Sequence, residues 1–199
     1  MVNWIEKKKR IKHGIAFAAL ALVIAGCASV VAVPPGPYVV SPSMTLNIGR
    51  IWTDFTPILP NQPKKVKMFT IDGPLLNRLY IGGDLVAGEG LTKPANKEMR
   101  VPTVKAQMSG IEQIEFLKES MAAFDFRNVV TSRPRQVQLS GKPAIRVDLS
   151  GSEQDGLEFA ATAIMQKNGD TYNVLLFVAP KEHYFGALLS EFNQLAGST

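Results

Sequence analysis

The chain has few of the residues that build metal and catalytic centres. Its 199 residues include one cysteine and two histidines. A single cysteine excludes an internal disulfide and any zinc or iron–sulfur site built from several cysteines. Charged residues make up 20% and hydrophobic residues 46%, which is typical of a globular domain and too apolar for a disordered chain. The length fits one domain of ordinary size.

Long apolar runs are also scarce, and the clearest one lies near the start. Basic residues at positions 7–10 and 12 precede an uncharged apolar run over residues 15–25. That run is shorter than the roughly 20 apolar residues that a permanent membrane helix needs. A basic segment, a short apolar stretch and small residues at its end are typical of a secretory signal. Because the basic segment stays cytoplasmic, we expect the rest of the chain to be exported.

The end of the apolar run resembles the lipobox of bacterial lipoproteins. It reads Ile24-Ala25-Gly26-Cys27, an aliphatic residue, two small residues and a cysteine, with isoleucine where leucine is more usual. The resemblance implies that Cys27 is lipidated, that a peptidase cuts between Gly26 and Cys27, and that fatty acid such as palmitate then acylates the new amino group. The alternatives are a buried free thiol and an uncleaved signal anchor.

The acyl chains on Cys27 would hold the mature protein on a membrane. One chain anchors only marginally, whereas two or three on one residue make desorption very slow. Ala28 and Ser29 follow, with no aspartate directly after the cysteine. In enteric bacteria that pattern resembles lipoproteins sorted to the outer membrane. We therefore expect residues 1–26 to be a signal peptide and the mature protein to be a periplasm-facing protein of the cell envelope, on the outer membrane in preference to the inner.

The net charge of +5 belongs mostly to the predicted signal. Five of the 22 basic residues and one of the 17 acidic residues precede Cys27, which leaves 17 basic against 16 acidic residues. A nearly neutral mature chain lacks the basic surface that nucleic-acid binding needs. We expect no nucleic-acid partner.

The segment after the cysteine is rich in proline. Prolines at positions 34, 35, 37 and 42, with almost no charge, predict that residues 27–45 form an extended tether. Val39 and Val40 are alternatively the beginning of the fold, as an edge strand. We expect residues 46–199 to be the globular domain, with a strand over residues 66–71 and a hairpin turn at residues 82–84.

The second half has the clearer pattern. Ile111, Ile114, Leu117, Met121 and Phe124 have helical spacing, with a capping box at residues 109 and 112 and a helix end near residues 127–128. Four strands of a meander follow, with turns at residues 141–143 and 168–169 and a fully covered last strand over residues 172–179. A closing helix carries an apolar stripe over residues 185–195.

This order predicts an α+β fold: a single domain with an antiparallel sheet of about six strands flanked by helices, like an α/β/α sandwich. Over residues 108–198, the helix, the antiparallel strands and the closing helix resemble the PsbP/Mog1-type fold. Its members are mostly accessory or binding proteins with no shared catalytic residues, so the resemblance implies no catalytic site.

Few side chains suggest chemistry. His183 has only Glu182 beside it as a partner, and the carboxylates at positions 148, 153, 155 and 158 lack the spacing of a calcium loop. We expect no enzyme, no cofactor and no metal. The one basic cluster consists of Arg127, Arg133, Arg135 and Arg146, either a partner surface or a solvated face.

Two functions remain open. The first is a membrane-anchored envelope lipoprotein with a non-catalytic accessory or protein-binding role and an envelope protein as partner. The alternative is a periplasmic module that binds a small ligand in an apolar cleft between sheet and helices.

Overall fold

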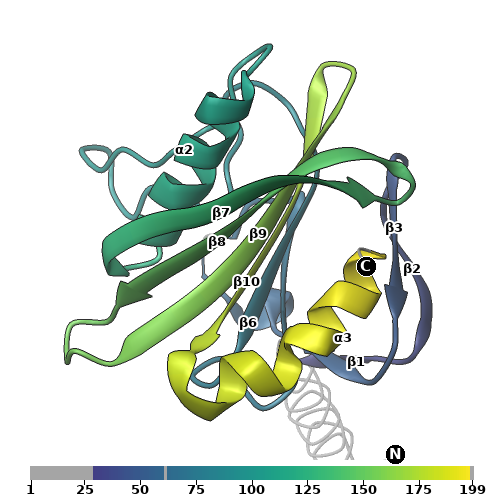
Figure 1. Ribbon diagram of the computed structural model, residues 1–199, viewed down its shortest axis with the longest axis vertical. Helices are drawn as coiled ribbons and strands as arrows, with labels where there is room; N and C mark the ends of the chain where they lie inside the picture. Colours follow the sequence, from purple (N-terminus) through teal and green to yellow (C-terminus); the bar gives the residue numbers. More distant parts are fainter. Residues whose placement is uncertain (1–28, 61, 198–199) are drawn as a thin grey trace, which may run out of the picture.

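The main element of the fold is an antiparallel sheet of eight strands (Figure 1). The computed structural model describes residues 29–60 and 62–197. Neighbouring strands follow the order β1-β4-β5-β6-β10-β9-β8-β7, and every pair is antiparallel. Two further strands, β2 and β3, pair with each other. The strands are β1 (Val31–Val33), β2 (Gly36–Ser41), β3 (Met44–Ile48), β4 (Trp52–Asp54), β5 (Val66–Thr70), β6 (Arg78–Leu85), β7 (Arg127–Leu139), β8 (Lys142–Ser152), β9 (Glu158–Asn168) and β10 (Thr171–Pro180).

The antiparallel sheet with flanking helices is confirmed, but the expected number of strands, about six, is wrong. The main sheet has eight strands and the β2–β3 hairpin adds two. The described residues form two α-helices, α2 (Gly110–Ala122) and α3 (Gly186–Ala196), and two short helical turns, η1 (Thr56–Ile58) and η2 (Lys181–Phe185). Strands of three residues, such as β1 and β4, are too short to show an alternating pattern in the sequence.

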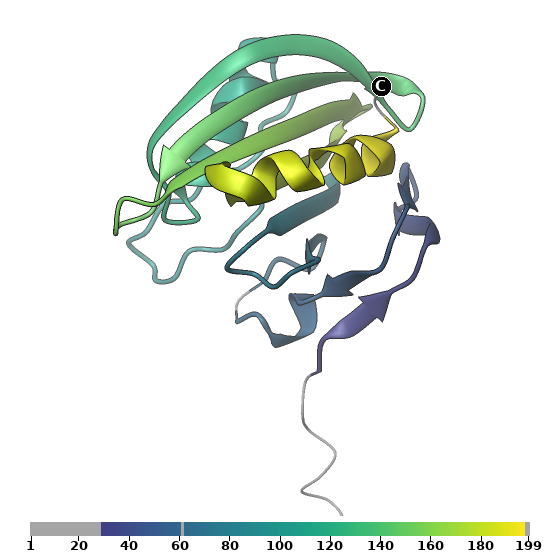
Figure 2. The same cartoon turned by 60° about the horizontal axis from the view of Figure 1, so that its bottom comes forward.

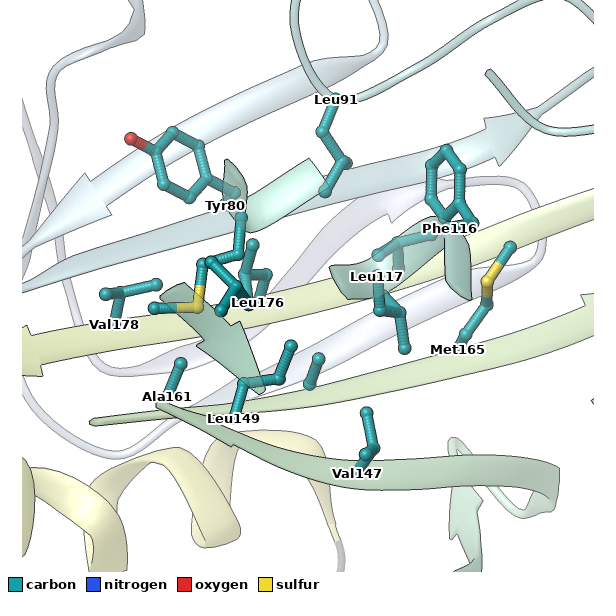
Figure 3. Packing of buried hydrophobic residues seen from close by; sticks show 14 of the residues in the cluster. Tyr80, Leu91, Phe116, Leu117, Val147, Leu149, Ala161, Met165, Leu176 and Val178 are labelled. Carbon is teal, nitrogen blue, oxygen red and sulfur yellow. The ribbon is translucent and has the colours of Figure 1, made fainter. Parts of the chain in front are cut away.

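Helix α2 covers one face of the sheet. The predicted capping box is present: the Ser109 side chain accepts a hydrogen bond from the Glu112 backbone, and the Glu112 carboxylate accepts the Ser109 N–H at 2.9 Å. Leu117 is buried as predicted, together with Phe116, but Ile111 is 78% exposed. Figure 3 shows Phe116 and Leu117 among the packed side chains of this core. The helix ends at Ala122, before the predicted end.

The opposite face carries a second core under α3 and the β2–β3 hairpin. Leu188, Phe192 and Leu195 of α3 are buried, as the predicted stripe required. Met44 and Leu46 of β3 pack in the same cluster. Figure 2 shows α3 lying along the sheet. The sheet is therefore covered on both faces, which explains why β10 is buried along almost its whole length.

The predicted meander is confirmed as β7 to β10. The β9–β10 turn has Gly169 and Asp170 at its centre, one residue later than predicted, because Asn168 still pairs with Thr171. Gly169 has φ +61°, which suits the first central residue of a type II′ turn.

The predicted hairpin at residues 82–84 is wrong. β6 continues through Gly82 and Gly83 to Leu85. A Cβ on Gly83 would lie 2.9 Å from the side chains of Val40 and Ser41. The glycine therefore allows β2 to approach the sheet closely, and its role is packing rather than turn formation.

Most of the predicted tether is part of the folded domain, which corrects the boundary at residue 46. β1 begins at Val31 and pairs with β4, and β2 pairs with β3. Val33 is only 6% exposed and Met44 only 1%. Val39 and Val40 lie in a strand, β2, as the alternative expected, but the fold begins earlier, at β1. The prolines are compatible with these strands because Pro34 and Pro35 follow β1, Pro42 lies in the β2–β3 turn, and the hairpin that contains Pro37 stands outside the main sheet.

Candidate functional site

A hollow of about 630 Å³ opens where α2 ends and β7 begins. The start of β6 and the loop after β8 complete its wall, so three segments that are distant in the sequence meet there. Its volume falls in the range of ordinary ligand and peptide sites. The residues that line it are Arg78, Ala122, Phe124, Asp125, Phe126, Arg127, Glu153 and Gln154, and we refer to them as the Arg78 hollow.

Arg78 is held by an ion pair and two aromatic rings in this hollow. Its guanidinium donates to Glu153 at 2.7 Å, and only 16% of its side chain is exposed. The same group lies 5.0 Å from the ring centre of Phe126 and 5.7 Å from that of Phe159. A cation held by both a carboxylate and two aromatic rings loses little further conformational freedom when a ligand binds.

Two pairs of aromatic side chains pack beside Arg78. Phe124 stacks on Tyr80 with ring centres 3.9 Å apart, and Phe126 meets Phe159 edge to face at 4.9 Å. Burial raises the pKa of Tyr80, and the nearby charge of Arg78 offsets only part of that rise. The phenol therefore stays neutral at physiological pH and acts as a packing group rather than as an acid or base.

The turn between α2 and β7 brings these groups together. Asp125 has φ +68° and Asn128 has φ +53°. Aspartate and asparagine tolerate this left-handed conformation better than other non-glycine residues. The tight turn places Phe124, Phe126 and Arg127 around the hollow within a few residues of the helix end.

The hollow offers charges of both signs next to aromatic surface. Arg78 and Glu153 form an ion pair with each other, while Arg127 and Gln154 are exposed. Arginine and aromatic residues are enriched at protein interfaces and dominate their binding energy. The arrangement suits recognition of a polar protein segment better than binding of an apolar small molecule.

The structure brings only part of the predicted basic cluster together: Arg135 and Arg146 are register partners on β7 and β8. Arg127 lies at the Arg78 hollow, and Arg133 is exposed further along β7. Arg135 forms a bidentate ion pair with Asp148, with hydrogen bonds of 3.1 and 3.2 Å. Arg146 is buried and donates to Thr162 and Asn193 at 2.9 and 2.7 Å.

Arg146 therefore belongs to the interior rather than to a surface. Its guanidinium lies 5.3 Å from the ring centre of Phe192, beneath α3. Burial and the neighbouring Arg135 lower its pKa, and Asp148 opposes them. Alternation along β8 could not reveal this position, because the charge is placed between a strand and a helix far away in the sequence.

The carboxylates of the predicted acidic turn have separate partners. Asp148 pairs with Arg135, Glu153 with Arg78, and Glu158 with Lys181 at 2.7 Å. In the described part of the chain, no group of three histidine, cysteine, aspartate or glutamate side chains is arranged to hold a metal ion. His183 is exposed, with its ring edge-on to Tyr184 at 5.1 Å.

A second hollow, of about 500 Å³, lies against the long loop that follows β6. Pro63, Pro94, Met99 and Val101 give it apolar walls, and Arg100 stands at its edge. No local sequence motif distinguishes this region. The space between α2 and the sheet, where an apolar cleft was expected for a small-ligand module, is filled by packed side chains (Figure 3).

The residues of the predicted lipobox, Ile24, Ala25, Gly26 and Cys27, lie outside the described residues. Within the described ranges, no helix has the length and apolar character needed to cross a membrane.

Comparison with known proteins shows a similarity at the level of the fold. No family model matches the sequence, and neither does any curated protein. The fold is similar to the solution structure of cyanobacterial PsbP (CyanoP) from Synechocystis sp. PCC 6803, with a TM-score of 0.46 and 13% sequence identity. The alignment covers 87% of this chain and 93% of that one.

Proposed function

We propose that this protein is a lipid-anchored protein of the bacterial cell envelope whose domain binds another envelope protein. The binding surface is the Arg78 hollow, and the role is accessory rather than catalytic. Acylated Cys27 is the anchor, and the domain faces the periplasm, with the outer membrane favoured over the inner.

The lipobox supports the anchor. The basic segment, the short apolar run and Ile24-Ala25-Gly26-Cys27 occur in the order that export, lipidation and cleavage require. Acylation of Cys27 with two or three chains would hold the mature chain on the membrane without a spanning helix. The cysteine is also the only one in the chain, so lipidation removes no disulfide partner.

The Arg78 hollow supports the binding role, and its geometry is the observation that carries the proposal. Arg78 is held in place before a partner arrives, by Glu153 at 2.7 Å and by the ring of Phe126. A pre-organised arginine beside aromatic rings lowers the entropy cost of association. Arg127 and Gln154 at the rim are exposed and supply polar contacts.

The second candidate is a module that binds a small ligand. The hollow beside the long loop favours it, because apolar walls from Pro63 and Met99 lie next to the basic side chain of Arg100. Such a site would take a small amphipathic anion. Mass spectrometry of protein purified in detergent separates the two candidates, since a retained small molecule supports this one.

A photo-crosslinking amino acid at Gln154 tests the protein-binding role in cells. We expect one discrete cross-linked product from this position and none from Gln136, an exposed glutamine on β7 away from the hollow. Arg127→Ala should weaken the product about tenfold, since an interface arginine is commonly worth about 1–2 kcal/mol. Arg133→Ala on the same strand is the control. Equal cross-linking from both glutamines would contradict the proposal.

The anchor has its own test. Cys27→Ser should abolish labelling of the protein by a radioactive fatty acid and leave an unprocessed precursor. Labelling that persists in the Cys27→Ser variant would show that the lipid is attached elsewhere or that the assignment is wrong.

A further inference from the structure

The folded domain begins only four residues after the proposed anchor. β1 starts at Val31, and its first residue pairs with Asp54 of β4. Four residues span at most about 14 Å when fully extended. A domain of this size has a radius of gyration of about 16 Å. The link from Cys27 is therefore too short to lift the domain away from a membrane, and the beginning of β1 must stay close to the lipid.

Exposed aliphatic side chains gather where the chain enters β1. Val30 is 42% exposed, Val31 51% and Ile58 43%. Ile58 lies in η1, which begins two residues after Asp54, the register partner of Val31. We call these three residues the β1-end surface. In Figure 2 the purple beginning of β1 lies at the lower end of the molecule, and β7 lies at the upper end.

The charges beside this surface are mostly paired. Lys67 lies 3.5 Å from Asp54, and Lys65 lies 2.8 Å from Glu89. Lys64 is exposed next to them. A surface with exposed aliphatic side chains, two ion pairs and one lysine outside these pairs can enter the headgroup region with little cost of charge desolvation, and Lys64 favours anionic lipid.

We infer that the β1-end surface rests on the phospholipid headgroups and fixes the orientation of the domain. The inference depends on the proposed lipidation of Cys27. The link length brings the surface to the membrane, and Val30, Val31 and Ile58 bury apolar area there. The sheet then points its other edge, β7, away from the bilayer. The start of β7, which lines part of the Arg78 hollow, lies at that other edge.

Single engineered cysteines test this orientation in the full lipidated protein. Cys27 is the only natural cysteine, and lipidation occupies its sulfur, so an introduced cysteine is the only free thiol. An environment-sensitive fluorophore is attached to Ile58→Cys or, as the control, to Val130→Cys on β7, where the side chain is 59% exposed. Each protein is reconstituted in vesicles of phosphatidylethanolamine, phosphatidylglycerol and a headgroup-nitroxide lipid.

We expect quenching at position 58 to exceed that at position 130 at least about threefold, because interfacial side chains lie ~5–10 Å into the headgroup boundary. Circular dichroism checks that both variants fold, which we expect because both replaced side chains are exposed. Equal quenching in vesicle-bound protein overturns the orientation and leaves the anchor intact. Protein that carries no acyl mass and does not float with vesicles refutes the anchor, and the orientation with it.

Discussion

Replacing Asn173 with alanine tests the polar network that fastens the β2–β3 hairpin to the main sheet. Asn173 is fully buried in β10. Its Nδ2 donates to Ser43 Oγ at 2.8 Å and to Gln166 Oε1 at 3.0 Å, and its Oδ1 accepts the Asp84 N–H at 2.9 Å. Ser43 lies in the turn between β2 and β3, so a single side chain links the hairpin to β6, β9 and β10.

The expected loss is large because Gln166 stays buried and Asp84 stays partly buried after the substitution. Alanine removes the donor to Gln166, which is also fully buried, and the acceptor for the Asp84 N–H. Each polar group left unsatisfied costs about 1–3 kcal/mol. We therefore expect Asn173→Ala to lower the free energy of unfolding by about 3 kcal/mol, a substantial part of the ~5–15 kcal/mol of an ordinary domain.

Urea unfolding followed by circular dichroism measures this loss. Asn47→Ala, at an exposed position of β3, is the matched control and should change the stability by less than about 0.5 kcal/mol. A double-mutant cycle with Ser43→Ala should show a coupling of at least about 0.5 kcal/mol. A loss below about 1 kcal/mol for Asn173→Ala, or no coupling to Ser43, would refute the reasoning.

Two further predictions concern local polar groups. Ser109→Ala should lower the unfolding free energy by about 1 kcal/mol, measured in urea, because the N-cap of α2 is lost; an unchanged midpoint would contradict it. Burial raises the pKa of Asp84, but hydroxyl hydrogen bonds, led by that of Ser43, outweigh it and hold the pKa below its usual value. The carboxylate therefore stabilises the fold above the pKa of unfolded aspartate, and this contribution is lost as the pH falls below about 4. Asp84→Asn should make the stability less dependent on pH in that range, and an unchanged pH profile would argue against the assignment.

The second half of the fold was predictable because its elements are long and locally patterned. The capping box at Ser109 and Glu112 and the alternation along β8 and β9 depend only on neighbours in the sequence. β1 and β4 have no such pattern, since three residues cannot display a period. Gly83 shows the same limit: its sequence context favours a turn, whereas the close approach of β2 decides its place in β6.

The candidate site could be predicted only in part. Arg127 was a candidate residue, and the structure places it at the Arg78 hollow. Arg78 was missed because its partners, Phe126 and Glu153, are about 50 and 75 residues away along the chain. Sequence neighbourhood grouped Arg127 with Arg146 instead, although α3 covers Arg146. Long-range contacts that form a site leave no local signal in a single sequence.

The edge of the sheet at β7 helps to decide how a partner is held. β7 is a long edge strand with exposed side chains along most of its middle, so strand addition by a partner would be the obvious mode. Register shifts interrupt its pairing with β8 on either side of Thr131, and Arg133 adopts φ +51° just before Pro134. The Arg135 guanidinium also donates to the carbonyl oxygen of Arg133 at 2.8 Å. Bulges, proline and charge at an edge prevent pairing with another strand, so the partner we propose is held by side chains in the Arg78 hollow and not by an added strand.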